Sequence, residues 1–201
     1  MYTRLKIVAA NWKMHKNLGE GLELATQVIE MLHDSNPMEP ILQVVLLPSF
    51  IHLSAVHKLL SSTGYIHVGA QNCHEQGLGA FTGEVSASML RSVGAKFVLI
   101  GHNERRTNFH EDSALLAQKV NAALLHGLQP IFCCGESSKA RKEGDHNFFV
   151  HEQLVTGLFH LSATQMAKSI IAYEPVWAIG TGESSTSTPV SYTHLTLPTK
   201  A

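Results

Sequence analysis

Short apolar runs alternate with amphipathic stretches along most of the chain. The apolar runs are unbroken rather than interrupted at every second residue, as expected for strands buried on both faces of a parallel sheet. These runs are Lys6–Ala10, Gln43–Leu47, Ile66–Ala70, Lys96–Ile100, Gln129–Cys133 and Ser169–Tyr173. The stretches of helical periodicity between them are Leu18–Leu32, Ile51–Leu60, Val85–Ser92, Ser113–His126 and Phe148–His160. The pattern predicts an α/β protein built from repeated strand–helix units.

Residues suited to begin or end a helix stand at the borders of two of these stretches. Asp112 or Ser113 can cap the helix expected from Ser113, and Gly127 can end it. Ser49, which follows Pro48, is a candidate cap for the helix expected near Ile51.

Two architectures suit such units: an open doubly wound sheet and a (β/α)8 barrel. A doubly wound dinucleotide-binding sheet carries a glycine-rich turn after its first strand, but here that strand runs into Asn11-Trp-Lys13 without a glycine. Polar residues instead follow several strands: Asn11 and Lys13, Gln71 and Asn72, His102 and Glu104, Glu136, and Glu174. Barrel enzymes place their catalytic residues at these strand ends, so the pattern favours a TIM (β/α)8 barrel with about six of its eight units.

The composition changes after Gly182. Residues 183–189 are polar, and residues 190–201 have neither helical periodicity nor a clear strand. A six-stranded barrel would leave its first and last strands with unpaired backbone groups. We therefore expect an incomplete barrel over residues 1–189 and a separate, irregular tail over residues 190–201.

Composition and charge exclude several function classes. The 201 residues carry a formal net charge of -1, with basic residues spread along the chain, so no basic surface for nucleic acid or anionic lipid is expected. No apolar run approaches the roughly 20 residues that cross a bilayer, and the N-terminus lacks a signal-peptide core. Only three cysteines occur, Cys73, Cys133 and Cys134, which favours a reducing compartment and a cytoplasmic location. The 13 histidines are scattered, so no metal is expected.

Glu174 is the strongest single candidate for chemistry. It ends the apolar run Ser169–Tyr173 and precedes Pro175 and a glycine-rich segment, and a carboxylate at such a place is costly without a purpose. His102 follows Gly101 at another strand end, and Lys13 follows the first strand. Taken singly, His102 and Lys13 could be ordinary solvated residues, and Glu104 with its neighbouring arginines could form a surface ion-pair cluster.

Taken together, these residues favour one kind of reaction. Glu174 can act as a base, His102 as an electrophile or acid, and Lys13 as a fixed positive charge beside a glycine loop for phosphate. No serine or cysteine has the surroundings of an activated nucleophile, and no Walker loop is present. The set is suited to removing a proton next to a carbonyl group and returning it, without a cofactor.

Six motifs resemble the triosephosphate isomerase family in order and spacing. They are Asn11-Trp-Lys13, Gly69-Ala-Gln-Asn72, Gly79-Ala-Phe-Thr-Gly-Glu84, Ile100-Gly-His-Asn-Glu-Arg105, Cys134-Gly-Glu136 and Ala172-Tyr-Glu-Pro-Val-Trp-Ala-Ile-Gly-Thr-Gly182. The resemblance covers residues 1 to about 189. It implies a TIM barrel that interconverts dihydroxyacetone phosphate and D-glyceraldehyde 3-phosphate through an enediolate.

The resemblance also implies a role for each candidate, and this family is itself the standard example of the Glu–His pairing. Glu174 is implied as the base, His102 as a neutral electrophile and Lys13 as the electrostatic stabiliser. Asn11 is implied to bind substrate, and Glu104 to position Lys13.

The family's mobile lid is expected here at Pro175, Val176, Trp177, Gly180, Thr181 and Gly182, and the N–H of Gly180 is expected to reach the phosphate. The segment Gln71–Glu84 resembles the loop that enters a partner subunit. In a homodimer of this kind, Thr82 would approach the other active site and Glu84 would pair with Arg105 across the interface.

The chain departs from the family at three places. Asn103 stands where serine is usual, and Glu183-Ser-Ser185 stands at the second hinge of the lid. After Pro189 nothing resembles the family's last two strands or their phosphate-binding loops. Two alternatives follow: a catalytically impaired fragment that still self-associates through Gln71–Glu84, and a phosphate-binding barrel for a larger sugar phosphate. The combined motifs disfavour the second.

Overall fold

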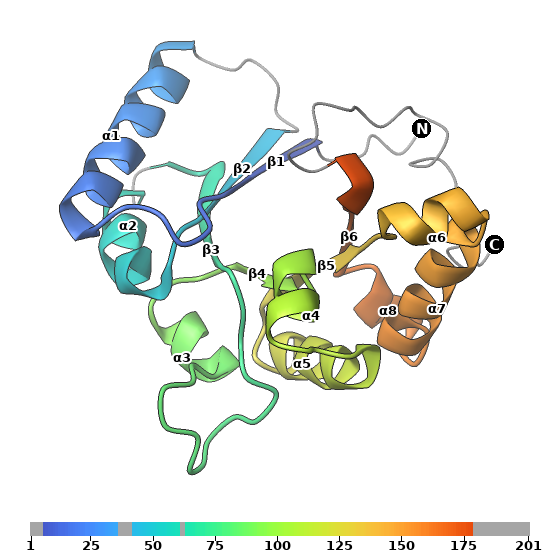
Figure 1. The fold of residues 1–201 in the computed structure, drawn as a ribbon. Helices are drawn as coiled ribbons and strands as arrows, with labels where there is room; N and C mark the ends of the chain where they lie inside the picture. The colour runs from blue at the N-terminus through green and yellow to red at the C-terminus, as the bar shows by residue number, and fades with distance from the viewer. Residues whose placement is uncertain (1–5, 36–41, 61–62, 179–201) are drawn as a thin grey trace. The chain divides into compact units, whose positions relative to one another are not determined.

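The computed structural model describes residues 6–35, 42–60 and 63–178 (Figure 1). These residues contain one parallel sheet with the strand order β1-β2-β3-β4-β5-β6. The strands are β1 Lys6–Asn11, β2 Leu42–Leu47, β3 Ile66–Ala70, β4 Phe97–Ile100, β5 Gln129–Cys134 and β6 Ile170–Tyr173. A parallel sheet in strict sequence order needs a crossover between each pair of neighbours, and the intervening helical segments supply it.

The helices described include those that the sequence pattern predicts and three others of four to six residues. The longer and predicted ones are α1 Leu18–Ser35, α2 Leu53–Leu59, α3 Ala87–Ser92, α5 Ser113–Leu125 and α7 His146–Leu158. The additional α-helices are α4 Asn103–Asn108, α6 Ser138–Glu143 and α8 Ala163–Met166. Two 3-10 turns, η1 Phe50–His52 and η2 Val176–Ala178, complete the described elements.

The chain divides into two compact units, each of which is described by itself. Unit 1 comprises residues 1–99 and 122–130, and unit 2 comprises residues 100–121 and 131–201. The boundary falls within β4, α5 and β5, so each of these elements passes from one unit to the other.

Unit 1 is organised around the first strands of the sheet. β1 pairs with β2 from Lys6↔Leu42 to Asn11↔Leu47, and β3 pairs with β4 at Gly69↔Phe97. Its buried core includes Val45, Leu46, Leu47, Val56, Val68, Leu90 and Phe97. Helices α1 and α2 pack against each other in this unit (Figure 1). The core thus lies where the apolar runs of β2, β3 and β4 predict it. The expectation of burial on both faces is wrong for β1, where Val8 is 56% exposed.

Unit 2 contains the paired strands that carry Glu136 and Glu174 just beyond their ends. β5 pairs with β6 in the register Ile131↔Ile170 to Cys134↔Tyr173. The core around them includes Phe132, Leu116, Val120, Val150, Leu154 and Leu158. Because the register aligns the two strand ends, the loops that follow β5 and β6 begin side by side.

The predicted helix ends were correct for α5 and wrong in part for the segment after Pro48. Asp112 Oδ1 accepts a hydrogen bond from the N–H of Leu115 at 2.8 Å, and Gly127 has a φ of +73° after the helix. Ser49 does precede η1, but its side chain makes no capping bond. Its hydroxyl instead donates to the carbonyl of Lys13 at 3.1 Å, which links two strand ends of unit 1.

Candidate active site

The loop after β5 fixes the position of Glu174. The backbone N–H of Glu174 donates to the carbonyl of Cys134 at 2.8 Å, extending the β5–β6 ladder by one bond. A Cβ added at Gly135 would lie 1.9 Å from the carbonyl oxygen of Glu174, so only glycine permits this approach. Gln153 holds Gly135 from the other side through bonds of 3.1 and 2.9 Å to its N–H and carbonyl. The backbone beneath the carboxylate is therefore held on both sides.

The carboxylate of Glu174 has two close partners. Its Oε1 lies 3.0 Å from Nε2 of His102, and its Oε2 accepts the backbone N–H of Asn103 at 2.9 Å. The side chain is 17% exposed. Burial raises the pKa of Glu174, and His102, the Asn103 N–H, Arg106 and Cys133 oppose that rise. Burial is the largest of these influences, so the carboxylate is a stronger proton acceptor than an ordinary glutamate.

His102 occupies the cap position of α4, and this determines which of its nitrogens carries a proton. The N–H of Glu104 donates to Nδ1 of His102 at 3.3 Å. A nitrogen that accepts an N–H bond carries no proton, so the neutral ring has its proton on Nε2. That proton points to Oε1 of Glu174. His102 thus presents Nε2 as a hydrogen-bond donor, a group that can polarise a carbonyl oxygen.

Arg106 links the two strand ends on which this pair depends. Its Nε donates to the carbonyl of Gly101 at 2.8 Å, and its Nη2 donates to the carbonyl of Cys133 at 3.0 Å. Gly101 has a φ of +78° and turns the chain into His102. The guanidinium therefore ties the residue before His102 to the strand that pairs with β6, and burial lowers its own pKa while Glu174 raises it.

A second carboxylate, Glu136, ends the neighbouring strand and is 2% exposed. Its Oε1 accepts hydrogen bonds from Tyr173 Oη at 2.8 Å, Trp177 Nε1 at 2.9 Å and Arg141 Nη1 at 3.0 Å. The Arg141 guanidinium also lies over the Trp177 ring, 4.3 Å from its centroid. Burial, followed by the bond to Glu136, raises the pKa of Tyr173 to about 12, so the phenol remains a donor. Glu136 thus fixes the side chain of Trp177 in η2.

Asn11 ends β1 in unit 1, and Lys13 follows it two residues later. Lys13 has a φ of +54°, a conformation that non-glycine residues adopt rarely and at a cost of about 1–3 kcal/mol. Three hydrogen bonds hold it there: its N–H donates to Asn11 Oδ1 at 2.9 Å, and its carbonyl accepts from Ser49 Oγ at 3.1 Å and Gln71 Nε2 at 2.8 Å. These bonds hold the backbone of Lys13 in its strained conformation.

Comparison with known proteins shows which family the chain belongs to. The sequence matches the triosephosphate isomerase family over residues 6–200. The chain belongs to the triosephosphate isomerase family. Triosephosphate isomerase of Amoebophilus asiaticus is 51% identical to this chain over 178 residues. The aligned residues make up 88% of this chain and 69% of the relative. The chain is 47% identical to triosephosphate isomerase of Cytophaga hutchinsonii over 95% of this chain and 74% of that relative.

A solved structure supports the fold in the same way. The crystal structure of triosephosphate isomerase from Bartonella henselae matches with a TM-score of 0.80 and 33% identity, over 95% of this chain and 73% of that chain. The predicted fold class is therefore confirmed: the described strands and helices are units of a TIM barrel. The isomerase class that the motifs imply is confirmed by the family match.

The structure brings together the predicted residues of unit 2. His102 contacts both Glu174 and Glu104, whose Oε2 lies 3.6 Å from His102 Nδ1. Asn11 and Lys13 lie together in unit 1. Of the predicted lid, Pro175, Val176 and Trp177 are described, whereas Gly180, Thr181 and Gly182 lie outside the described residues.

The predicted dimer residues lie on two separate segments. Thr82 and Glu84 are exposed in the long loop between β3 and α3 (Figure 1). Arg105 is in α4, where its Nε donates to Glu111 Oε1 at 2.8 Å within the same chain. The pairing of Glu84 with Arg105 of a second copy stays a prediction.

Three residues that shape the site, Gln71, Arg106 and Glu136, received no individual role from the sequence, although Gln71 and Glu136 were placed among the strand-end polar residues. Gln71 and Glu136 stand at strand ends just as Glu174 does, so their position was the available signal. Their roles depend on bonds to residues 58, 37 and 41 positions away along the chain, which no local pattern reveals. Arg106 was considered only as part of a surface cluster, although most of its bonds are to backbone carbonyls.

Two further observations concern the part of the chain that is described. No group of three or more histidine, cysteine, aspartate or glutamate side chains there is arranged to hold a metal ion. None of the helices in residues 6–35, 42–60 and 63–178 combines the length and apolarity that a bilayer crossing requires.

Proposed function

We propose that the chain interconverts dihydroxyacetone phosphate and D-glyceraldehyde 3-phosphate by proton transfer through an enediolate. The observation that carries the proposal is the pair Glu174–His102: a half-buried carboxylate whose pKa burial raises, with its Oε1 3.0 Å from Nε2 of His102. A base and a hydrogen-bond donor at that spacing suit a reaction at two adjacent carbon atoms.

The proton moves between neighbouring carbons of the substrate. Glu174 takes the proton from the carbon next to the carbonyl group, and the N–H of His102 donates to the oxygen on which negative charge develops. In the substrate-free geometry that N–H is directed to Glu174. Substrate binding therefore has to separate the two side chains, which frees the carboxylate to accept a proton and the imidazole to donate. Glu174 then returns the proton to the other carbon.

Lys13 and Asn11 supply the remaining polar groups. The ammonium of Lys13 stabilises the enediolate and the phosphate dianion, and Asn11 binds substrate after fixing the backbone of Lys13 through its Oδ1. Glu104 positions Lys13. The left-handed backbone of Lys13 supports this role, because strain of this kind persists where surrounding bonds enforce it and is common at functional sites.

A lid formed by residues 175–182 closes over the substrate, with the N–H of Gly180 on the phosphate. Its first hinge is Pro175-Val176-Trp177, and Glu136 holds the indole N–H at 2.9 Å. Closure excludes water, which protects an enediolate intermediate from losing its phosphate.

The active chain is a homodimer in the cytoplasm and needs no metal or cofactor. The exposed loop between β3 and α3 supports a partner contact, because Leu78 and Phe81 are 87% and 43% exposed on it. The backbone there is ordered by an isolated bridge between His74 and Ser86 and by the bond from Glu84 N–H to the Phe81 carbonyl at 3.0 Å. Thr82 and Glu84 lie on this loop and would reach the partner's site and Arg105 respectively.

The test is to assay the purified chain with D-glyceraldehyde 3-phosphate in heavy water. Turnover with deuterium appearing on the carbon of dihydroxyacetone phosphate next to the carbonyl group supports the proposal. Glu174 can return the same proton or first exchange it with solvent, so the variant Glu174→Gln decides its role in the same assay: turnover equal to that of the wild type would contradict proton transfer through Glu174. Sedimentation in parallel separates the alternative: a folded dimer without turnover would indicate a catalytically impaired protein that self-associates.

A further inference from the structure

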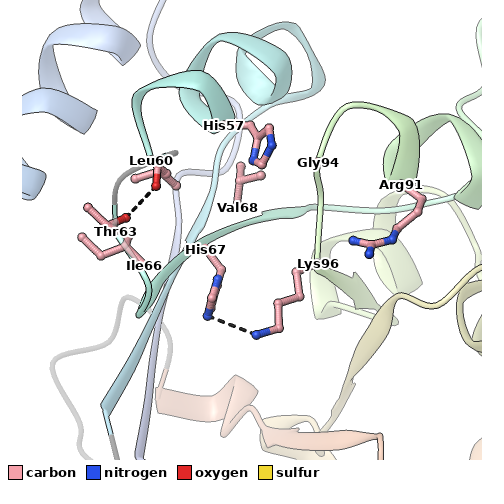
Figure 2. Close-up of a pocket in the computed structure, with 9 residues that line it drawn as sticks. All are labelled: His57, Leu60, Thr63, Ile66, His67, Val68, Arg91, Gly94 and Lys96. Atoms are coloured by element: carbon pink, nitrogen blue, oxygen red, sulfur yellow. Dashed lines mark hydrogen bonds between the residues drawn. The ribbon is translucent and has the colours of Figure 1, made fainter. Parts of the chain in front are cut away.

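A pocket of about 280 Å³ lies in unit 1 and is lined by none of the proposed catalytic residues (Figure 2). Its floor is formed where β3 begins at Ile66 and where Lys96 precedes β4. Lys13 and Gln71, by contrast, follow the carboxyl ends of β1 and β3. The pocket is thus at the opposite ends of the strands from the substrate-binding residues of this unit.

The polar groups that line the pocket are mostly basic. Arg91, Lys96, His57 and His67 contribute to its wall, and no lining residue is acidic. The Nζ of Lys96 lies 3.1 Å from Nε2 of His67 (Figure 2). An ammonium can only donate, so Nε2 is the acceptor and the neutral ring carries its proton on Nδ1. Burial, followed by the charge of Lys96, lowers the pKa of His67.

The ends of the neighbouring helices do not neutralise this charge. The carbonyl of Leu60 accepts from both the N–H and the hydroxyl of Thr63, each at 2.9 Å. The carbonyl of Arg91 accepts the N–H of Gly94 at 3.1 Å. Carbonyls that are already hydrogen-bonded are poor partners for a further cation. In the described part of the chain, neither Arg91 nor Lys96 forms a salt bridge with a carboxylate.

The two cations are nevertheless oriented. Arg91 Nη1 donates to the carbonyl of Ala95 at 3.3 Å, and the ammonium of Lys96 lies 5.5 Å from the centre of the Phe97 ring. Gly94 has a φ of +90°, and a Cβ there would meet the ring of His57 at 2.2 Å. A side chain at Gly94 would therefore displace the ring of His57, which lines the pocket, so the glycine permits the present shape of the wall.

We propose that this pocket binds a small molecule through a phosphate group or an equivalent tetrahedral dianion. The guanidinium of Arg91 and the ammonium of Lys96 supply charge-assisted donors, and the neutral His67 supplies its Nδ1–H. The apolar walls, which include Ile66 and Val68, leave room for a short organic group beside the anion. The occupant is thus free phosphate or a small phosphomonoester. The site is separate from the proposed isomerase site, and either can exist without the other.

The test follows the imidazole signal of His67 by NMR, assigned with the variant His67→Gln, while inorganic phosphate or glycerol 3-phosphate is added at constant ionic strength. We expect a saturable shift of this signal with at least one of the two ligands. Tighter binding of glycerol 3-phosphate indicates a phosphomonoester site, and tighter binding of phosphate indicates a free-anion site. Because the readout is His67 itself, occupation of the proposed active site does not produce the shift.

Variants of Arg91 and Lys96 test whether these basic residues bind the anion. Lys96→Gln and Arg91→Gln each remove one charged donor, and each should weaken anion binding by about tenfold or more. Lys142→Gln removes an exposed charge on α6 and should leave the affinity unchanged. Arg91 is itself exposed, so its variant reports on binding even if Lys96→Gln fails to fold. The proposal is overturned if the His67 signal does not saturate with either ligand, or if Arg91→Gln binds as tightly as Lys142→Gln.

Discussion

Two carboxylates stand just beyond the ends of neighbouring strands, and their surroundings differ: Glu136 is buried and Glu174 is half-buried. Glu136 accepts hydrogen bonds from a phenol, an indole and a guanidinium. Glu174 has one backbone N–H and one imidazole nitrogen within bonding distance. Both follow an apolar strand of the same sheet, so strand position alone does not distinguish them.

The difference assigns the two side chains to different tasks. Donors and a cation stabilise the charge of Glu136 and commit it to holding Trp177, whereas burial makes the charge of Glu174 costly. A carboxylate that gains from taking up a proton suits a base, and one already engaged by several donors suits an anchor. The comparison teaches that solvation of the carboxylate, rather than its place in the fold, separates chemistry from support.

The largest expected effect is on turnover. Glu174→Gln keeps the size of the side chain but removes its basicity, so kcat should fall by about 10²–10⁴. Glu136→Gln is the matched control and should lower kcat by less than about tenfold, because it does not touch the substrate. Steady-state isomerase assays of both variants measure the difference. Equal losses in the two would show that the carboxylates do not have separate roles.

The next effect is on stability, where a change at Glu136 should cost more than it costs in turnover. Glu136→Ala leaves Tyr173 and Arg141 without their acceptor, and removing one member of a buried charged cluster costs about 3–5 kcal/mol. Arg141 is 31% exposed, so the lower end of that range is expected. Urea unfolding measures the change, with the exposed Glu152→Ala as the control. If Glu136→Ala loses no more unfolding free energy than Glu152→Ala, the anchoring role of Glu136 is contradicted.

A smaller effect is expected for single donors to Glu136. Tyr173→Phe removes the hydrogen bond to a charged acceptor and should cost about 1.5 kcal/mol of unfolding free energy. Tyr65 provides a matched comparison, because its hydroxyl donates to the neutral carbonyl of Leu32 at 3.3 Å. Tyr65→Phe should cost about 0.5 kcal/mol. If the two tyrosine variants lose equal stability, the charge of Glu136 adds nothing to its bonds.

The smallest effect is a change in the pH dependence of stability. A raised pKa means that the folded chain holds the Glu174 proton more tightly than the unfolded chain. Below the unfolded pKa both states are protonated and there is no penalty. As pH rises through the folded pKa, Glu174 destabilises the fold. Glu174→Gln should therefore be more stable than wild type at neutral pH, and the gap should close in acid. Thermal unfolding across that pH range would contradict this by showing a constant or inverted gap.

Much of the fold was predictable because it depends on short-range patterns. Uninterrupted apolar runs located all six strands to within a few residues, and Asp112 and Gly127 correctly marked the ends of α5. The helices α6 and α8 were missed, since they have six and four residues and too few turns for an apolar period to appear. Ser49 was assigned to a helix cap from its neighbours, yet its hydroxyl bonds to the distant carbonyl of Lys13.

The site divides in the same way. Glu174, His102 and Lys13 were predictable from strand ends and motifs. The left-handed backbone of Lys13 was not, because no glycine marks it and the bonds that enforce it come from Ser49 and Gln71. The tautomer of His102 depends on the start of α4, a six-residue helix without an apolar period. The backbone conformation of Lys13 and the tautomer of His102 thus depend on hydrogen bonds that the local sequence pattern does not reveal.

The most direct test is a titration of the Glu174 carboxyl carbon by NMR, assigned with Glu174→Gln. The account predicts a midpoint above the ordinary value of 4.5 for this side chain, because burial outweighs the contacts that favour its charge. A midpoint at or below 4.5 would mean that Glu174 is as well stabilised as an anchoring carboxylate, and would contradict the assignment of the base.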